Sequence, residues 1–500
     1  MNKQEKTPYL TALIDYVKSN PVPFDVPGHK LGGFQSDLSR LVSSCFFEYD
    51  ANAPIGLDNL YNAKGVIKEA EELASEATDA DYCFFSVNGT TGGIITIILG
   101  SLYSKDKIIL PRNIHKSVVN ALIVSGAIPV FVNPDIDEEL GIACGVKSED
   151  YIKAMDENPT AKAIFVINPT YFGIASDLRT LVNEAHKRNM IVIVDEAHGS
   201  NFYFSDELPI SAMSAKADIT AMSMHKNSGS LTQSSMILMK KKYLSYYDIK
   251  KAFTMFSSTS PNPLLIASLD AARKEMAIHG KEIIHNCLNL ACYARSELNK
   301  IPGIKVYGKE YLEKRHNSGC FDIDLTKLVI DVTGLGLYGY EVYKEIRKKY
   351  NVQLELGEVS VVLAIISPGT KKEHVDKLID AFKKLSSEYY KKNENIEIPK
   401  YNYSYPINLV SPRVAYDAPH KVVDLTSSIG EISAETIMAY PPGIPILIPG
   451  EIISSDAIDL IEFYKREGGE VLKDTAENKI NIIDRKNWYL SEDLPYTFKD

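Results

Sequence analysis

The sequence predicts an α/β protein with a mixed, mostly parallel sheet in its major domain, a smaller α/β domain and a C-terminal α+β domain. Three observations support this. Short apolar strands alternate with helical stretches between residues 81 and 239, the pattern of parallel sheets. At 500 residues, the chain is too long for one hydrophobic core. A polar stretch with prolines at residues 391–406 reads as a linker before the last hundred residues. We therefore expect an N-terminal segment at 1–65, a cofactor-binding major domain at 66–270, a small domain at 271–395 and a C-terminal domain at 396–500.

Composition indicates a soluble protein of the cytoplasm. The net charge of −10 gives no electrostatic reason to bind nucleic acid. The longest apolar run is far shorter than the roughly 20 residues of a membrane span, and the first residues lack the apolar core of a signal peptide. The six cysteines have no zinc-site spacing and are expected to be free thiols; they are Cys45, Cys83, Cys144, Cys287, Cys292 and Cys320. We expect no metal site, nucleic acid partner or membrane partner.

The first chemical feature lies between a strand at residues 81–87 and an apolar helix at residues 94–104, preceded by helices at 9–20 and 66–79. The motif NGTTGG opens this apolar helix, where backbone N–H groups and the helix dipole favour an anion. It supplies the phosphate-binding candidates Asn88, Gly89, Thr90 and Thr91. An ordinary glycine turn with a threonine cap is the alternative, and the missing GK[ST] ending argues against a nucleotide P-loop.

Two later strands deliver an acid and an amine. Asp195 follows the strand at residues 191–194, and Lys226 follows the strand at residues 218–224. Ligands bind at the carboxyl ends of parallel strands. Pyridoxal phosphate requires a lysine for its Schiff base and an acid that keeps the ring nitrogen protonated. His115, after the strand at residues 107–111, can stack on the ring, or be a cap or surface residue.

A literal GxGxxG at Gly334–Gly339 follows a strand and precedes a helix, as a dinucleotide fingerprint does. Glu355 or Glu358 would then be the ribose ligand. We reject this interpretation because only a short βαβ region lies behind the motif, whereas a dinucleotide fold has two such halves. A tight connection in a small domain is the simpler explanation.

Seven segments carry a resemblance to a known family. They are PGHKLGG, NGTTGG, PRNIHKS, VDEAHG, SMHKNSGSLTQSS, SSTSP and YPPGIPILIPGE. From about Thr7 to Ile453 the chain resembles the bacterial ornithine/lysine/arginine decarboxylases, above all the short Gram-positive arginine decarboxylases of polyamine biosynthesis. This resemblance implies the aspartate-aminotransferase fold, pyridoxal phosphate as cofactor, and a homodimer or higher homo-oligomer that shares its active site between subunits.

The resemblance also implies residue roles. Lys226 would be the Schiff-base lysine, Asp195 the partner of the ring nitrogen and His115 the stacking residue, with Ala197 on the opposite ring face. Ser223 and His225 would lie near the phosphate beside Gly89, Thr90 and Thr91, and His198 of VDEAHG is a further cofactor-binding candidate. Thr259 would reach the phosphate from the neighbouring subunit, or cap a helix before Pro261. The chain departs from the family pattern at Asn227, Ser228 and Glu431.

The predicted reaction is α-decarboxylation of a basic amino acid, with arginine to agmatine and CO2 favoured over lysine or ornithine. Lys226 and His115 are candidates for the proton donor at Cα. Glu435 is expected to bind the distal cationic group of the substrate, with Glu431 and Glu451 as rivals. The alternatives are an aminotransferase with Arg413 on the α-carboxylate, and an NAD-dependent reductase built on Gly334–Gly339.

Overall fold

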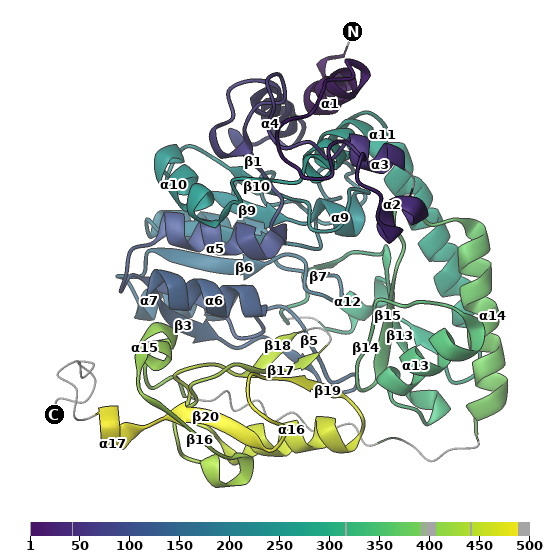
Figure 1. Ribbon diagram of the computed structural model, residues 1–500. Helices are drawn as coiled ribbons and strands as arrows, with labels where there is room; N and C mark the ends of the chain where they lie inside the picture. The colour runs from purple at the N-terminus through teal and green to yellow at the C-terminus, as the bar shows by residue number, and fades with distance from the viewer. Residues whose placement is uncertain are drawn as a thin grey trace. The chain divides into compact units, whose positions relative to one another are not determined.

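The computed structural model in Figure 1 describes residues 2–42, 44–315, 318–391, 396, 407–440 and 443–488. The chain divides into two compact units. Unit 1 comprises Met1–Ser101, Val192–Asn286 and Ser367–Gly369, and unit 2 comprises Leu102–Ile191, Cys287–Ile366 and Thr370–Asp500. The bounds of the four expected segments stay predictions, and most of the expected linker lies outside the described residues.

The largest sheet has seven strands in the order β1-β10-β9-β8-β6-β2-β3. β2 pairs in parallel with β3 and β6, and β8 pairs in parallel with β9, whereas β10 is antiparallel to β1 and β9. The mixed, mostly parallel sheet is therefore confirmed. Its strands are β1 (Tyr82–Ser86), β2 (Lys107–Pro111), β3 (Ile128–Val132), β6 (Ala163–Ile167), β8 (Ile191–Glu196), β9 (Ile219–Met222) and β10 (Ser235–Met239).

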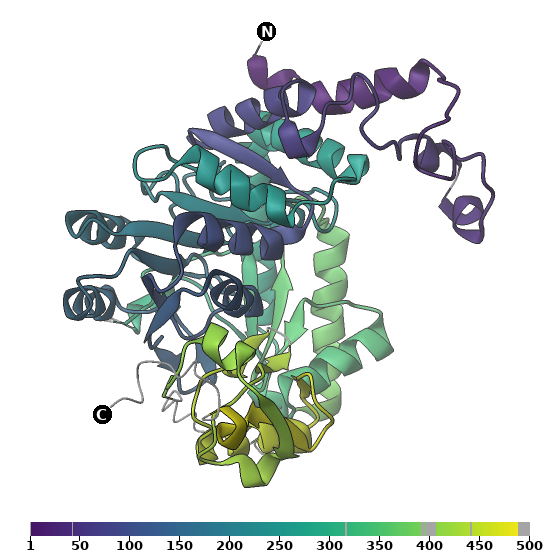
Figure 2. The same cartoon turned by 60° about the vertical axis from the view of Figure 1, so that its left-hand side comes forward.

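The helices of unit 1 begin with α1 (Pro8–Lys18), α2 (Asp37–Val42), α3 (Ser44–Glu48) and α4 (Val66–Ala77). Figure 2 shows the segment with α2 and α3 extending away from the strands of the same unit. Further along lie α5 (Gly89–Ser101), α9 (Met224–Asn227), α10 (Tyr246–Phe256) and the start of α11 (Pro263–Leu298). Gly100 lets α5 and α10 pack closely, since a Cβ there would lie 3.0 Å from Ile249 Cα. Across the described ranges, every helix is too short or too polar to span a bilayer.

Unit 2 contains α6 (Lys116–Ser125), α7 (Ser148–Glu157) and α8 (Leu178–Lys187), together with a second sheet. That sheet runs β11 (Lys305–Val306), β13 (Lys327–Asp331), β15 (Val361–Ile365), β14 (Leu356–Gly357), and all its pairings are antiparallel. α13 (Gly339–Tyr350) and α14 (Lys372–Tyr389) belong to the same part of the chain.

The GxGxxG motif serves backbone packing in this antiparallel region. A Cβ on Gly334 would lie 2.7 Å from Gly303 Cα, and one on Gly339 would overlap the carbonyl oxygens of Glu358 and Val361. Gly336 has φ +65°, a conformation that glycine adopts without strain. The dinucleotide fold requires parallel βαβ units. The structure therefore agrees with a tight connection and gives the reductase alternative no support.

The C-terminal part of unit 2 mixes helices with small antiparallel sheets, as predicted. β16 (His420–Asp424) pairs with β20 (Lys479–Ile483), and β17 (Ile437–Tyr440) lies between β18 (Ile444–Leu447) and β19 (Glu470–Leu472). The helices are α15 (Pro412–Asp417), α16 (Ser455–Arg466) and α17 (Arg485–Trp488). An aliphatic core joins α16 to β17, β18 and β20 and includes Leu425, Ile437, Leu447, Ile453, Ile458, Ile461 and Ile480.

A buried ion pair joins this C-terminal part to the end of β2 within unit 2. Arg112 Nε and Nη2 each lie 2.8 Å from one carboxylate oxygen of Glu451, and both side chains are almost completely buried. Arg112 also donates to the carbonyl oxygens of Pro445 and Ile446, while the N–H of Ile448 donates to Glu451. Glu451, a rival candidate for substrate binding, is therefore fully engaged in holding the PRNIH and IPGE motifs together.

Candidate functional site

Lys226 lies in α9, the short helix that connects β9 to the antiparallel β10, so it follows the carboxyl end of β9. Its Nζ lies 2.9 Å from His198 Nε2, within hydrogen-bonding distance. Asn227 Nδ2 donates to the carbonyl of His198 at 2.5 Å, and Ser228 Oγ lies 2.9 Å from Ser200 Oγ. Two of the three residues that depart from the family pattern thus fix the helix of the lysine to the loop after β8.

Asp195 lies near the carboxyl end of β8, beside Ala221 of the parallel strand β9. The acid lies one residue before the end of β8, where this strand is still paired, and the lysine follows the neighbouring parallel strand β9. The backbone N–H of Ala197 donates to Asp195 Oδ1 at 3.0 Å, and the residue is 7% exposed. This hydrogen bond holds one carboxylate oxygen in place.

Glu196 follows Asp195, and successive side chains of a strand point to opposite faces. Its carboxyl group is completely buried and accepts from the N–H of Ala212 at 2.7 Å, from Thr220 Oγ1 at 3.1 Å and from the hydroxyl of Tyr203. Burial raises the pKa of Glu196 to about 8, and the charge of Asp195 adds to this effect, whereas the three donors oppose it. Two adjacent carboxyl groups are therefore placed in different electrostatic environments.

The NGTTGG motif forms the start of α5, and its glycines allow the close turn. Gly89 has φ +65° and donates its N–H to the carbonyl of Gln233 at 2.8 Å. A Cβ on Gly93 would lie 3.1 Å from Ala221 Cβ, so this glycine lets α5 approach β9. The first N–H groups of a helix have no acceptor within the helix, and they suit a phosphate.

Three buried hydroxyl groups cluster beside this turn. Thr90 Oγ1 lies 2.6 Å from Ser223 Oγ and 2.9 Å from Ser235 Oγ. Ser235 Oγ in turn donates to the carbonyl of Met222. The cluster brings together two predicted phosphate-side residues with Ser235, which sequence reasoning missed. The signal was present, since Ser235 lies in the quoted SLTQSS segment.

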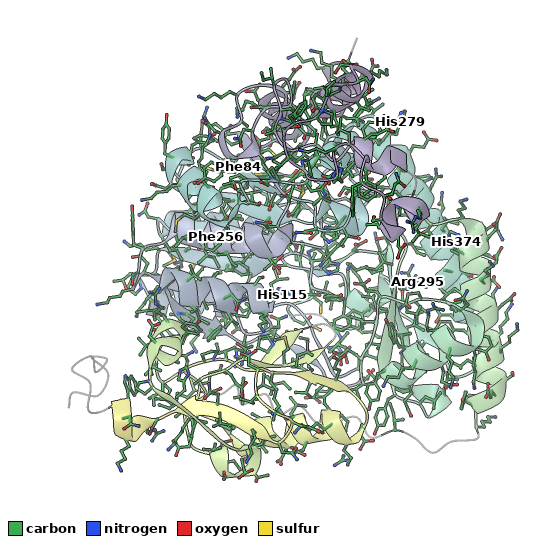
Figure 3. The ribbon with its side chains drawn as sticks, viewed as in Figure 1. Phe84, His115, Phe256, His279, Arg295 and His374 are labelled. Carbon is green, nitrogen blue, oxygen red and sulfur yellow. The ribbon has the colours of Figure 1, made fainter. Side chains whose placement is uncertain are left out.

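The other candidates of unit 1 have more local partners. Asn88 Nδ2 donates to the carbonyl of Phe256, a residue labelled in Figure 3, and so anchors the turn. His225 Nδ1 lies 2.8 Å from the carbonyl oxygen of Ser234. Thr91 is exposed at the helix start, and Thr259 is exposed between α10 and α11. Their cofactor-binding roles, with that of Ala197, stay predictions.

His115 and Glu435 belong to unit 2. His115, labelled in Figure 3, is exposed and caps α6, because its Nδ1 accepts from the N–H of Ser117 at 3.1 Å. This confirms the cap alternative, while stacking on a cofactor ring stays a prediction. Glu435 is 3% exposed and accepts four hydrogen bonds from the N–H groups of Asp474, Thr475 and Asn481 and the hydroxyl of Thr475. Its predicted role as substrate ligand is not visible in these contacts.

The remaining C-terminal candidates have structural partners as well. Arg413 pairs with Asp417 at 2.9 Å and donates to the carbonyl oxygens of Ile123 and Val124. These contacts favour the structural role of Arg413 over the α-carboxylate role of the aminotransferase alternative. Glu431 Oε2 lies 3.5 Å from Arg485 Nε near the surface.

Two family models match the chain. The Orn/Lys/Arg decarboxylase major domain matches residues 7–374, and the Orn/Lys/Arg decarboxylase C-terminal domain matches residues 408–469. The chain belongs to the Orn/Lys/Arg decarboxylase family. Lys226, Asp195 and the hydroxyl cluster all lie within the major domain of this family.

Curated relatives and a solved structure agree with this membership. The chain is 40% identical over 486 residues to the arginine decarboxylase of Bacillus subtilis, covering 96% of this chain and 98% of that protein. It is 42% identical over 471 residues to the arginine decarboxylase of Halalkalibacterium halodurans, covering 94% and 95%. The lysine decarboxylase of Francisella novicida has the same fold, with a TM-score of 0.81, 22% identity and coverage of 95% and 81%.

The raised pKa of Glu196 predicts a pH dependence of stability. Its folded pKa of about 8 exceeds the ordinary value of 4.5, so the folded chain holds the proton more tightly. The contribution of this bound proton to the free energy of unfolding is fully present below pH 4.5 and is lost as the pH rises toward 8. Each tenfold difference in proton affinity is about 1.4 kcal/mol. Glu196→Gln should therefore flatten the fall of the unfolding midpoint between about pH 5 and pH 8.

Thermal unfolding of both proteins across this pH range measures the effect. Glu431→Gln, which changes a partly exposed carboxylate, is the matched control and should keep the wild-type slope. Equal slopes for wild type and Glu196→Gln would contradict the assignment.

Proposed function

We propose that this protein removes the α-carboxylate of a basic amino acid, with L-arginine as the favoured substrate, using pyridoxal 5′-phosphate held in unit 1. The observation that carries the proposal is the position of Asp195 and Lys226 at the carboxyl ends of neighbouring parallel strands, with the hydroxyl cluster and the start of α5 in the same unit. The arginine decarboxylases at 40–42% identity support the choice of substrate.

The donor set of unit 1 fits this cofactor. Bound pyridoxal phosphate would accept the electron pair that is released when the bond between Cα and the α-carboxylate breaks. Lys226 offers the amine that would hold the aldehyde, and Asp195 offers a fixed negative charge for the protonated ring nitrogen. The N–H groups at the start of α5, with Thr90 and Ser223, offer donors for the phosphate.

His198 is positioned to take a proton from the amine of Lys226 and to return it. An amine is a nucleophile only after it loses its proton, and the imidazole nitrogen lies 2.9 Å from Nζ. An imidazole titrates near neutral pH and can both take and return a proton there. Asn227 supports this geometry by binding the backbone carbonyl of His198.

A cytoplasmic location stays a prediction. The five cysteines whose side chains the structure describes are free.

Lys226→Ala should abolish decarboxylation and the visible absorption band of lysine-bound pyridoxal phosphate, because no amine remains to hold the aldehyde. CO2 release and the absorption spectrum of the reconstituted protein measure the two effects. Lys216→Ala removes a lysine whose surface partner is Asp79 and should leave both unchanged. Retention of the band in Lys226→Ala would refute the assignment of the lysine.

Glu435→Gln tests the assignment of the distal-group ligand. The carboxylate is saturated by four donors, so we expect its replacement to lower stability by about 1–3 kcal/mol. The order of kcat/KM for arginine, lysine and ornithine should then stay the same, with agmatine as the main product. Glu431→Gln is the matched carboxylate control. A tenfold or greater change in the arginine-to-lysine ratio for Glu435→Gln alone would instead support direct substrate binding.

We further propose that the protein is a homo-oligomer, as a dimer or larger assembly, joined through its N-terminal segment. This part of unit 1 exposes many large apolar side chains: Val22, Phe24, Val26, Phe34, Leu38, Leu41, Phe46 and Ile55. Phe24 is 92% exposed and Phe34 is 66% exposed. Large exposed apolar surfaces mark interfaces between proteins. Thr259, exposed in the same unit, would be accessible to a neighbouring subunit.

The double substitution of Phe24 and Phe34 by Asp should shift the protein toward a smaller species, because charges at a buried interface lack compensation. Sedimentation velocity measures the shift. Tyr416→Asp, which changes an exposed aromatic residue of unit 2, is the control. A wild-type protein that sediments as a fully active monomer would exclude the shared assembly.

A further inference from the structure

Two buried cysteines of unit 2 meet although 176 positions separate them in the chain (320 − 144). Cys144 follows β5 (Ile142–Ala143), and Cys320 precedes β12 (Asp322–Ile323). Their neighbours Gly145 and Gly319 cross so closely that a Cβ on either would overlap the backbone of the other. The two thiols hydrogen-bond to each other, and both side chains belong to one apolar cluster.

Asp135 fixes this crossing from both sides. Its backbone carbonyl accepts from the N–H of Cys144 at 2.7 Å, and its N–H donates to the carbonyl of Gly145 at 3.0 Å. Its Oδ2 accepts from the N–H of Gly319 at 2.7 Å. The segments that carry the two cysteines are therefore hydrogen-bonded to one residue, and their close approach is part of the folded structure.

The two thiols have unlike environments. Cys144 is 0% exposed and lies 3.4 Å from the hydroxyl of Tyr311, whereas Cys320 is 7% exposed. The hydrogen bond between the thiols, with burial, raises the pKa of Cys144. The same hydrogen bond, together with Ser318 and the nearby guanidinium of Arg315, lowers the pKa of Cys320. Arg315 is held beside the pair by Asp137 at 2.5 Å and by the ring of Tyr311.

We propose that Cys144 and Cys320 form a redox-active pair of thiols that hydrogen peroxide oxidises to a disulfide. Nothing in this proposal depends on decarboxylation. The more accessible, more acidic thiol is the one that attacks an oxidant, and a neighbouring thiol then resolves the product. Here Cys320 takes the first role and Cys144 the second.

The reaction balances in two steps. The Cys320 thiolate attacks one peroxide oxygen, the O–O bond breaks, and the other oxygen leaves as hydroxide, which takes up the proton that the Cys320 thiol had released and becomes water; Cys320 is left as a sulfenic acid. Cys144 sulfur then attacks Cys320 sulfur, the S–O bond breaks, and the oxygen leaves as a second water with the proton of Cys144. Two thiols lose two electrons and two protons in total, and one peroxide becomes two waters.

Peptide mapping of the full-length purified protein tests the proposal. After treatment with one equivalent of hydrogen peroxide per chain, digestion without reductant should yield a linked peptide pair with Cys144 and Cys320. Titration under denaturing conditions should fall from six thiols per chain to four, and dithiothreitol should restore all six. A Cys292→Ser background removes an exposed thiol that could form disulfides between molecules.

Variants assign the two roles. Cys144→Ser should trap the sulfenic acid on Cys320, visible as a dimedone adduct, and Cys320→Ser should give neither adduct nor linked peptide. Cys287→Ser, which changes a buried cysteine of α11, is the matched control and should still form the link. The proposal is overturned if the wild-type pair stays reduced under conditions that oxidise Cys292. This outcome is read on the unmutated chain and does not depend on the folding of any variant.

Discussion

The buried pair of Arg112 and Glu451 is the constraint on which the second unit depends. Both charges are removed from water, and their partners include each other and nearby backbone groups. Loss of one partner of such a pair costs about 3–5 kcal/mol, because the remaining charge stays buried without compensation. The segment that leads to His115 and the C-terminal motif that ends at Glu451 must therefore fold together. This ion pair links two motifs that lie far apart in the sequence.

Unit 1 positions its candidate site through strand pairing, and it also contains a buried ion pair of its own, between Arg273 and Asp270. The parallel alignment of β8 and β9 places Asp195 beside Ala221, and the antiparallel return to β10 brings Ser235 to Thr90. Short residues line this region, since Gly93 and the three hydroxyl side chains leave backbone and hydroxyl donors close together. The candidate site is a consequence of sheet geometry, with its polar groups at the end of neighbouring strands.

Local patterns were sufficient to predict much of this arrangement. The strand at 107–111 was predicted with the bounds of β2, and Asp195 and Lys226 were placed at strand ends from apolar periodicity alone. Ser235 escaped notice because its partner Thr90 is remote in sequence and depends on the position of β10. The sequence also could not show that the carboxylate oxygens of Glu435 accept hydrogen bonds from backbone donors. A buried structural acid and a substrate-binding acid cannot be distinguished before their spatial neighbours are known. The division into units likewise depends on long-range contacts.

The anchoring of α9 limits how Lys226 can move. Asn227 and Ser228 hold the backbone next to the lysine against the loop of His198 and Ser200, so freedom remains mainly in the torsions of the lysine side chain. The long side chain therefore rotates about a Cα atom whose position stays fixed. Rotation of its torsions can move the amine from one binding partner to another and back, without any rearrangement of the main chain. The entropy of ordering the main chain at this position is lost during folding, and only the side-chain torsions remain to be ordered.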